Sequence, residues 1–233
     1  YGLTVRIVKS KHNSQTVSNH SHTIVFSVVV VLALLFFAST YGYARAYAAE
    51  VKSFTATKAI RNNDAVAVYN LQRETIKLNP YVDVYRRRYS NTNLSIAAAL
   101  AQKTDLTEEE AAQFSQLVEQ AIREARAATA LDPVDARNWA NLAETYRSLI
   151  GVAEGAEQWT VSSYTNAIQL APTEPTLRID IGGVFYNQGA YDDAAQFFQQ
   201  AIGLKPDMVN AYYNLANTYS LQNKLELART TYQ

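Results

Sequence analysis

A spacing of 34 residues between matching positions constrains the fold of this chain more than any other feature of its sequence. Small and large apolar residues recur together at that spacing in the C-terminal part. Examples are Ile181 with Leu215, Gly182 with Ala216, Phe185 with Tyr219, and Phe198 with Tyr232. A repeat of this length is one supersecondary unit that cannot bury its apolar face alone, so neighbouring units must stack. The sequence therefore predicts an all-α solenoid rather than one compact core.

Each repeat is predicted to be a helix, a short turn and a second helix. An earlier unit matches at an offset of 39, because five extra residues lie within 150–159. Gly151 and Gly155 suit the longer turn that such an insertion needs. The residues predicted to start or end helices are the caps Asp135 and Asp207, the first-turn Pro175 and the helix-breaking Gly189.

Over residues 136–233 this pattern resembles the tetratricopeptide repeat (TPR) family. Two full units and a truncated third are expected, at 136–174, 175–208 and 209–233. Members of the family that bind partners use a concave groove lined by the first helix of each pair, so the resemblance implies a protein or peptide ligand. The positions that match the groove are Arg137, Asn141, Glu144, Asp180, Gly183, Tyr186, Asn187, Asn210, Tyr213, Asn214 and Asn217.

The asparagines among these positions favour recognition of a peptide backbone. Asn141 and Asn214 share one register, and an amide side chain offers both a donor and an acceptor to an extended peptide. The competing interpretation is that they are solvated polar residues of amphipathic helices. A variant of the family clamps a C-terminal carboxylate with Lys, Asn and Arg. Because Ala140, Glu144 and Tyr213 occupy clamp positions here, that mode is not expected.

An uncharged apolar segment precedes the repeats. Residues 23–43, TIVFSVVVVLALLFFASTYGY, would span about 30 Å of hydrocarbon as a helix. We expect a transmembrane helix, preceded by a basic polar lead at 1–22. The alternative is a cleaved signal peptide, since Ala46-Tyr47-Ala48 resembles a small-x-small cleavage site. Basic residues flank both ends of the segment, so the topology stays open, with the repeats placed outside the cytoplasm as the working expectation.

Residues 44–135 are predicted to be a helical linker with divergent TPR-like helices. A helix is expected over 64–77, and the TEEE sequence at 107–110 predicts a capping box before a helix at 111–130. Tyr81, Tyr85 and Tyr89 recur every four residues and are expected on one helical face. The basic run at 86–88 is interpreted as solvated surface, because consecutive residues point around a helix.

Composition argues against catalysis in this segment. Cysteine is absent, and the three histidines, at 12, 20 and 22, all precede the apolar segment. No phosphate loop, dinucleotide fingerprint or nucleophile elbow is present, so no catalytic residue, cofactor or metal site is expected. From residue 132 onward eleven Asp and Glu face six Lys and Arg, a net charge of −5 that disfavours nucleic acid. Whether a longer protein is an enzyme stays open.

Two roles remain for the chain as a whole. It begins at Tyr1 and stops within a helical pattern, so we expect a fragment of a longer protein. The first role is a membrane-anchored scaffold that binds a protein or peptide. The second comes from AAEVKSFTATKAIRNNDAVAVYNLQRETIKLNP at 48–80 and YRRRYSNTNL at 85–94, which are similar to tails of bacterial O-antigen ligase or polymerase-like membrane proteins. In that case the catalytic part would lie upstream.

Overall fold

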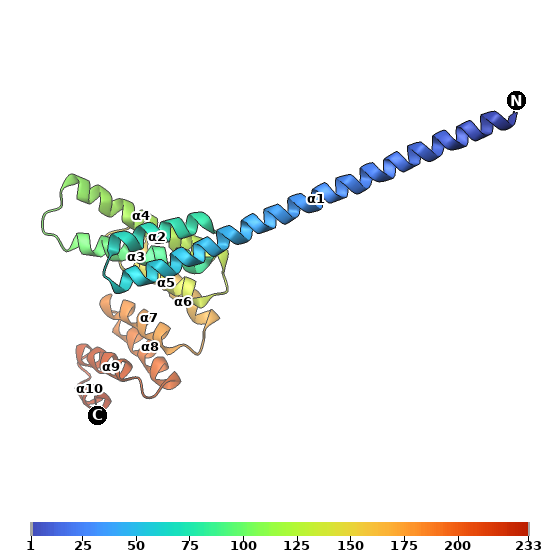
Figure 1. Cartoon of the computed structure of the whole chain (residues 1–233). Coiled ribbons are helices and arrows are strands. Elements are labelled where there is room, and N and C mark those ends of the chain that lie inside the picture. Colours follow the sequence, from blue (N-terminus) through green and yellow to red (C-terminus); the bar gives the residue numbers. More distant parts are fainter. Residues whose placement is uncertain (1, 233) are drawn as a thin grey trace. The chain divides into compact units, whose positions relative to one another are not determined.

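The computed structural model describes residues 2–232, with side chains from residue 22 onward (Figure 1). Helices are the one regular secondary structure among these residues, which confirms the all-α prediction. The ten helices are α1 (Gly2–Arg61), α2 (Ala65–Leu78), α3 (Asp83–Ala101), α4 (Glu108–Leu131), α5 (Ala136–Arg147), α6 (Ala156–Leu170), α7 (Pro175–Asn187), α8 (Tyr191–Leu204), α9 (Val209–Leu221) and α10 (Leu225–Thr231).

The chain divides into two compact units, residues 1–51 and 52–233. The first unit is helical, and the side chains of its apolar stretch are exposed; Phe36 and Phe37, for example, expose 67% and 68% of their surface. Among the described residues, one helical segment, His22–Arg61, has the length and the mean hydropathy, 2.5, of a membrane span. A segment so close to the N-terminus has the properties of a signal sequence as well.

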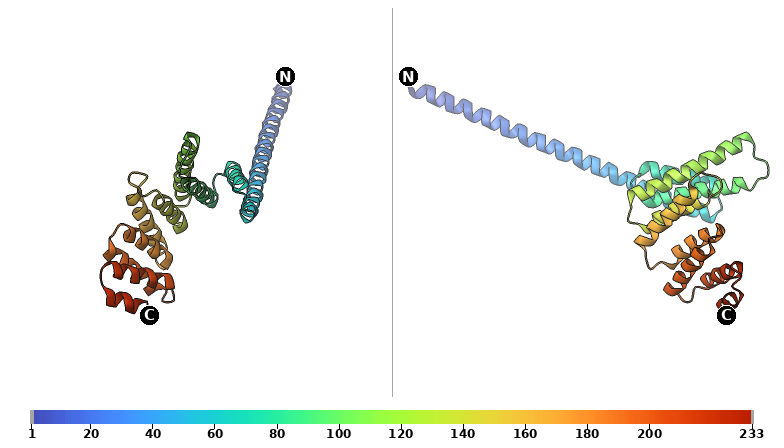
Figure 2. Two further views of the ribbon diagram at one scale, coloured as in Figure 1. Left: turned by 90° about the vertical axis from the view of Figure 1, so that its left-hand side faces the viewer. Right: turned by 180° about the vertical axis from the view of Figure 1, so that it is seen from behind.

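The second unit is a TPR-like solenoid of helix pairs. α3 packs with α4, α5 with α6, α7 with α8, and α9 with α10, and neighbouring pairs contact each other in chain order. Figure 2 shows this succession from green to red. The core forms where small and large residues meet, as the sequence predicts: Gly182, Ala194 and Ala201 are buried beside Phe198, which is 1% exposed. A Cβ atom added at Gly182 would lie 2.7 Å from Cε1 of Phe198.

Local signals explain most of the helix boundaries. Asp135 caps α5 by accepting a hydrogen bond from the backbone N–H of Arg137, and Thr107 and Glu110 form the predicted capping box of α4. The prediction for Asp207 is wrong, because the residue at the cap of α9 is Met208 and no side chain caps that helix. Backbone geometry there starts the helix one residue later than the cap pattern suggests.

The turns between paired helices use left-handed backbone conformations. Gly189 has a φ of +77° and Asn223, 34 residues later, has a φ of +59°. Asparagine tolerates this region better than other residues with a Cβ, so it replaces glycine at the equivalent turn. Gly151 and Gly155, with φ of +84° and +72°, form the longer turn that was predicted between α5 and α6.

Two predictions for the divergent region need correction. Tyr81 is 82% exposed and precedes α3, so it shares no helical face with the buried Tyr85 and Tyr89. The basic run at 86–88 is not simply solvated surface, because its three arginines hold different helices together. Arg86 binds Glu124 of α4 at 2.7 Å, Arg87 contacts Asp135 at 3.4 Å, and Arg88 donates to Ser53 Oγ at 3.1 Å.

Candidate functional site

The sequence-predicted groove positions lie on the first helices of three successive pairs, α5, α7 and α9. α7 and α9 contact each other directly, whereas α5 contacts α3 on the side of the preceding pair. The positions therefore fall into two groups with different surroundings. One group, Asn141, Glu144 and Asp180 on α5 and α7, is buried or partly buried, and the other, on the end of α7 and on α9, is more exposed and uncharged.

Asn141 is buried in the interface between α5 and α3. It is 7% exposed, and its Nδ2 donates to Thr145 Oγ1 at 3.3 Å and lies 3.5 Å from Ser90 Oγ. Asn141 shares the repeat register of Asn214. The register does not show that α3, 40 or more residues earlier in the chain, covers Asn141. Asn141 therefore lies within the helix packing and is not accessible to an extended ligand.

A charged cluster lies where α5, α6 and α7 meet. Both Oε atoms of Glu144 accept hydrogen bonds at 2.8 Å from Arg147, and Glu144 also accepts one from the Tyr164 hydroxyl at 3.1 Å. Burial raises the pKa of Tyr164, and the nearby carboxylates Asp180 and Glu144 raise it further. Glu144 and Asp180 are among the predicted groove positions, whereas their partners Arg147 and Tyr164 are not, although Arg147 follows Glu144 at the i,i+3 spacing of a helical ion pair.

Asp180 is half-buried beside this cluster. Burial raises its pKa above the ordinary carboxyl value and the charges of Glu144 and Glu174 act in the same direction, whereas Arg147 lowers it. A carboxyl whose pKa is raised on folding binds its proton more tightly in the folded chain than in the unfolded chain. Its contribution to stability is therefore complete below the unfolded pKa and is lost as pH rises through the folded pKa.

Replacing Asp180 with asparagine should raise the melting temperature at pH 7, because the amide removes a charge that folding partly desolvates. The gain should disappear near pH 2.5, about a unit or more below the ordinary pKa of the carboxyl group, where Asp180 is largely protonated in both states. Thermal denaturation followed by circular dichroism at both pH values measures the difference. Asp193→Asn, at an exposed site on α8, is the matched control. An Asp180→Asn chain that melts lower than wild type at pH 7 contradicts this account.

The uncharged group is a row of amides and tyrosines on α7 and α9. Among the described residues, no hydrogen bond joins the side chains of Asn187, Asn210 or Asn214 to another residue. Tyr213 is 57% exposed and meets Tyr232 edge to face, with 6.1 Å between ring centroids. The members of this α7–α9 face are Tyr186, Asn187, Asn210, Tyr213, Asn214 and Asn217.

Arg137 and Gly183 complete the predicted set but add little to a binding surface. The Arg137 side chain is 77% exposed and forms an ion pair with Asp135 at 2.7 Å, next to its own helix cap. An ion pair this exposed to solvent adds little to stability. Gly183 has no heavy atom within 4 Å of a Cβ built on it, so it leaves an open position on α7.

A second polar cluster, outside the predicted positions, joins α3, α4 and α5. Asn138 is fully buried; its Nδ2 donates to Asp83 Oδ2 at 2.9 Å and faces the carbonyl oxygens of Ala128 and Asp132 at 3.2 and 3.1 Å. Its Oδ1 accepts a hydrogen bond from Arg87. Carboxylate oxygens of Asp83, Asp132 and Asp135 lie within 4.8 Å of one another, a spacing that a cation would fit. Here the guanidinium of Arg87 supplies the positive charge.

Comparisons with known proteins agree with the repeat architecture. Residues 182–223 match the family model described as TPR repeat. A human protein, Protein O-mannosyl-transferase TMTC1, is 33% identical over 88 residues, which are 38% of this chain and 9% of that protein. The chain thus matches less than a tenth of the length of this curated relative.

Solved structures, one of them described as that of a TPR protein, resemble the chain over most of its length. A MamA protein superposes with a TM-score of 0.60 at 16% identity, covering 79% of this chain and 88% of that one. TTC0263, a TPR protein of Thermus thermophilus, superposes with a TM-score of 0.58 at 20% identity, covering 79% of this chain and 88% of that one. PilF of Pseudomonas aeruginosa gives 0.61 at 14% identity, with coverage of 81% and 75%. At these identities the similarity establishes the fold alone: an all-helical TPR-like solenoid.

Proposed function

We propose that this chain is a membrane-anchored TPR scaffold that binds a protein or peptide partner on the α7–α9 face. The observation that supports the site best is the set of asparagine side chains on this face that form no hydrogen bond with other described residues. The amides of Asn138 and Asn141 are used in packing between helices, whereas those of Asn187, Asn210 and Asn214 stay available. TPR proteins generally bind protein or peptide partners, and this surface has groups suited to such a ligand.

The chemistry of the face suits an extended peptide. Each amide can donate to a peptide carbonyl and accept from a peptide N–H at the same time. Tyr186 and Tyr213 add flat apolar area with a polar end, the combination that is enriched where proteins meet. No lysine or arginine belongs to the face, so recognition would depend on hydrogen bonds and apolar contact rather than on charge.

Replacing both Asn210 and Asn214 with alanine should weaken peptide binding about tenfold, since two hydrogen bonds at about 0.5–1.5 kcal/mol each are lost. The melting temperature should hardly change, because neither side chain is buried. The probe is the best peptide selected from a displayed library of random 12-residue peptides, and its affinity is measured by fluorescence polarisation. Asn166→Ala on the second helix α6 is the control. Failure to select any peptide with the wild-type chain, or equal affinity of the double variant, contradicts the proposal.

Anchoring through residues 23–43 is the second part of the proposal. The length, the uncharged composition and the exposure of these side chains support it. An anchored chain stays in the membrane fraction after alkaline carbonate extraction, whereas a cleaved signal leaves a soluble product whose N-terminal sequence starts near Ala49. A reporter fused after the last repeat, active only outside the cytoplasm, tests the extracytoplasmic placement of the repeats.

A second candidate role is the non-catalytic tail of a larger membrane protein that transfers glycans. The name of the human relative, an O-mannosyl-transferase, is the observation that favours it, together with the similarity of residues 48–94 to bacterial ligase-like tails. The reading frame upstream of Tyr1 separates the two roles. About ten further apolar segments of roughly 20 residues would favour the tail, and an initiating Met with none would exclude it.

A further inference from the structure

Away from the α7–α9 face, a groove lies between the α1–α2 hairpin and α3, within the unit 52–233. It consists of two cavities of about 570 and 190 Å³ that share Ile60, Gln72 and Arg88 as lining residues. The larger cavity alone is in the size range of about 300–1,000 Å³ that is usual for ligand sites. Ile60, Val68 and Ile96 make much of its wall apolar.

Gln72 is buried at the junction of the two cavities with an unused acceptor. The residue is 6% exposed, and its Oε1 accepts no hydrogen bond from any residue between 22 and 232. Buried side-chain oxygens are nearly always paired, because an unpaired one keeps the cost of losing water without compensation. A ligand that brings an N–H or O–H donor to this point would supply the missing hydrogen bond.

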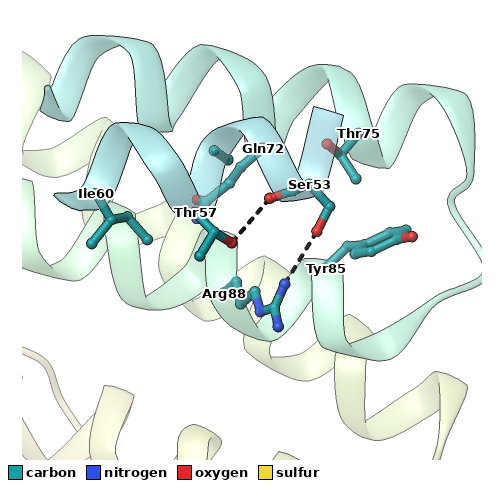
Figure 3. A pocket seen from close by; sticks show the side chains of 8 residues that line it. Ser53, Thr57, Ile60, Gln72, Thr75, Tyr85 and Arg88 are labelled. Carbon is teal, nitrogen blue, oxygen red and sulfur yellow. Dashed lines mark hydrogen bonds between the residues drawn. The ribbon is translucent and has the colours of Figure 1, made fainter. Parts of the chain in front are cut away.

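Arg88 lies beside Gln72 with a charge that no carboxylate compensates. Its neighbours differ: Arg86 is paired with Glu124, and Arg87 with Asp83 and Asp135, whereas Arg88 has no ion pair among the described residues. One guanidinium nitrogen, Nη1, donates to Ser53 Oγ at 3.1 Å, as Figure 3 shows. A guanidinium has five N–H donors, so others are left for an anionic group.

The opposite charge lies elsewhere in the groove. Asp64 lines only the larger cavity, where its Oδ1 caps α2 by accepting from the N–H of Ala67 at 2.9 Å. Asn91 and Ser95 of α3 also line this cavity and offer uncharged donors and acceptors. The groove therefore favours a ligand with a negative group beside Arg88 and a hydrogen-bond donor beside Gln72. A second negative group near Asp64 would be repelled.

We propose that this groove binds a short, extended apolar peptide segment with an acidic side chain that pairs with Arg88. The lining residues of α3 run from Arg88 to Ala99, about 16 Å along a helix, which equals about five residues of extended chain. One peptide unit supplies an N–H for Gln72, and another supplies a carbonyl for the Asn91 amide. Apolar side chains would cover Ile60, Val68 and Ile96.

The experiment uses the whole chain in nanodiscs of zwitterionic lipid and ten capped pentapeptides of leucine and alanine. Five of them carry one aspartate, moved through the five positions, and five carry asparagine instead. Isothermal titration calorimetry should show at least one aspartate peptide binding about tenfold more tightly than its asparagine match, the size expected for a charge-assisted hydrogen bond. Arg88→Gln should remove this preference, Arg88→Lys should keep part of it, and Arg229→Gln, an exposed arginine on α10, should leave it intact.

A second variant and a mapping step complete the test. Gln72→Met should weaken the binding of all ten peptides about threefold. The melting temperature of the free chain should stay the same or rise, because a buried unpaired acceptor is removed. A lower melting temperature with unchanged affinity would assign Gln72 to the core and overturn the proposal. Photo-reactive leucine in the peptide should crosslink to α2 or α3. Crosslinks confined to α5, α7 and α9, or the absence of binding by all ten peptides, would also overturn it.

Discussion

Replacing Gly182 with valine should lower the free energy of unfolding by about 2–3 kcal/mol, as expected for overpacking a close-packed interior. The Cβ of any substituent would lie 2.7 Å from Cε1 and 3.0 Å from Cδ1 of Phe198, closer than carbon atoms approach. Phe198 is 1% exposed and packed against Ala194 and Leu215, so its ring has little room to move. Valine adds two methyl groups to this contact, and the α7–α8 pair would have to separate.

The neighbouring glycine of the same helix provides the control. A Cβ at Gly183 meets no heavy atom within 4 Å, so Gly183→Ala should stabilise the chain by about 0.5–1 kcal/mol through helix propensity. Urea denaturation followed by tryptophan fluorescence measures both changes, since Trp139 and Trp159 lie in the preceding helix pair. Equal effects at the two positions would show that close packing at Gly182 does not limit stability.

Replacing Asn138 with leucine should lower the free energy of unfolding by about 3 kcal/mol, because this one substitution breaks a buried polar cluster. Asn138 is fully buried and bonded to Asp83, Arg87 and two backbone carbonyls. Leucine has a similar size but no polar atoms, so it leaves the Arg87 charge and the two carbonyls without this partner. The helices α3, α4 and α5 meet at this point, and the divergent region should loosen from the regular repeats.

Asn166→Leu on α6 is the matched substitution, because the side chain of Asn166 only bonds back to the Ser162 carbonyl of its own helix. Its expected effect is within about 0.5 kcal/mol. Denaturation followed by tryptophan fluorescence applies again, since Trp139 is the residue after Asn138. If Asn138→Leu proves as mild as Asn166→Leu, water or rearranged side chains satisfy the cluster and it does not hold the helices together.

The repeats could be predicted from sequence because their contacts are local and periodic. Pairs such as Gly182 with Phe198 lie within one unit and recur 34 residues later as Ala216 with Tyr232. The repeat pattern therefore predicts these contacts directly. The sequence of the divergent region contains no repeat that predicts its contacts. Arg86 binds Glu124, 38 residues later, and Arg87 binds Asn138, 51 residues later. Helical periodicity does not relate side chains that are so far apart in the sequence. The interpretation of 86–88 as solvated surface failed for this reason.

The binding positions show the same division. Register alone placed Asn141 and Asn214 in one row, but whether each is accessible depends on the helix that precedes it. α3 covers Asn141 on α5, whereas Asn214 on α9 stays partly exposed. The groove beside Gln72 and Arg88 could not be anticipated either, because it depends on how closely α2 approaches α3, and no motif in the sequence specifies that distance.

The long turn between α5 and α6 has a practical consequence for handling this protein. Five extra residues are accommodated there by the positive φ angles of Gly151 and Gly155, while Tyr146 and Trp159 on either side still stack at 5.8 Å. Val152 and Glu154 at the tip are exposed. A position that already tolerates added length without disturbing its neighbours is a natural place to insert an epitope tag or a small reporter, leaving both the N-terminal helix and the last repeat unmodified.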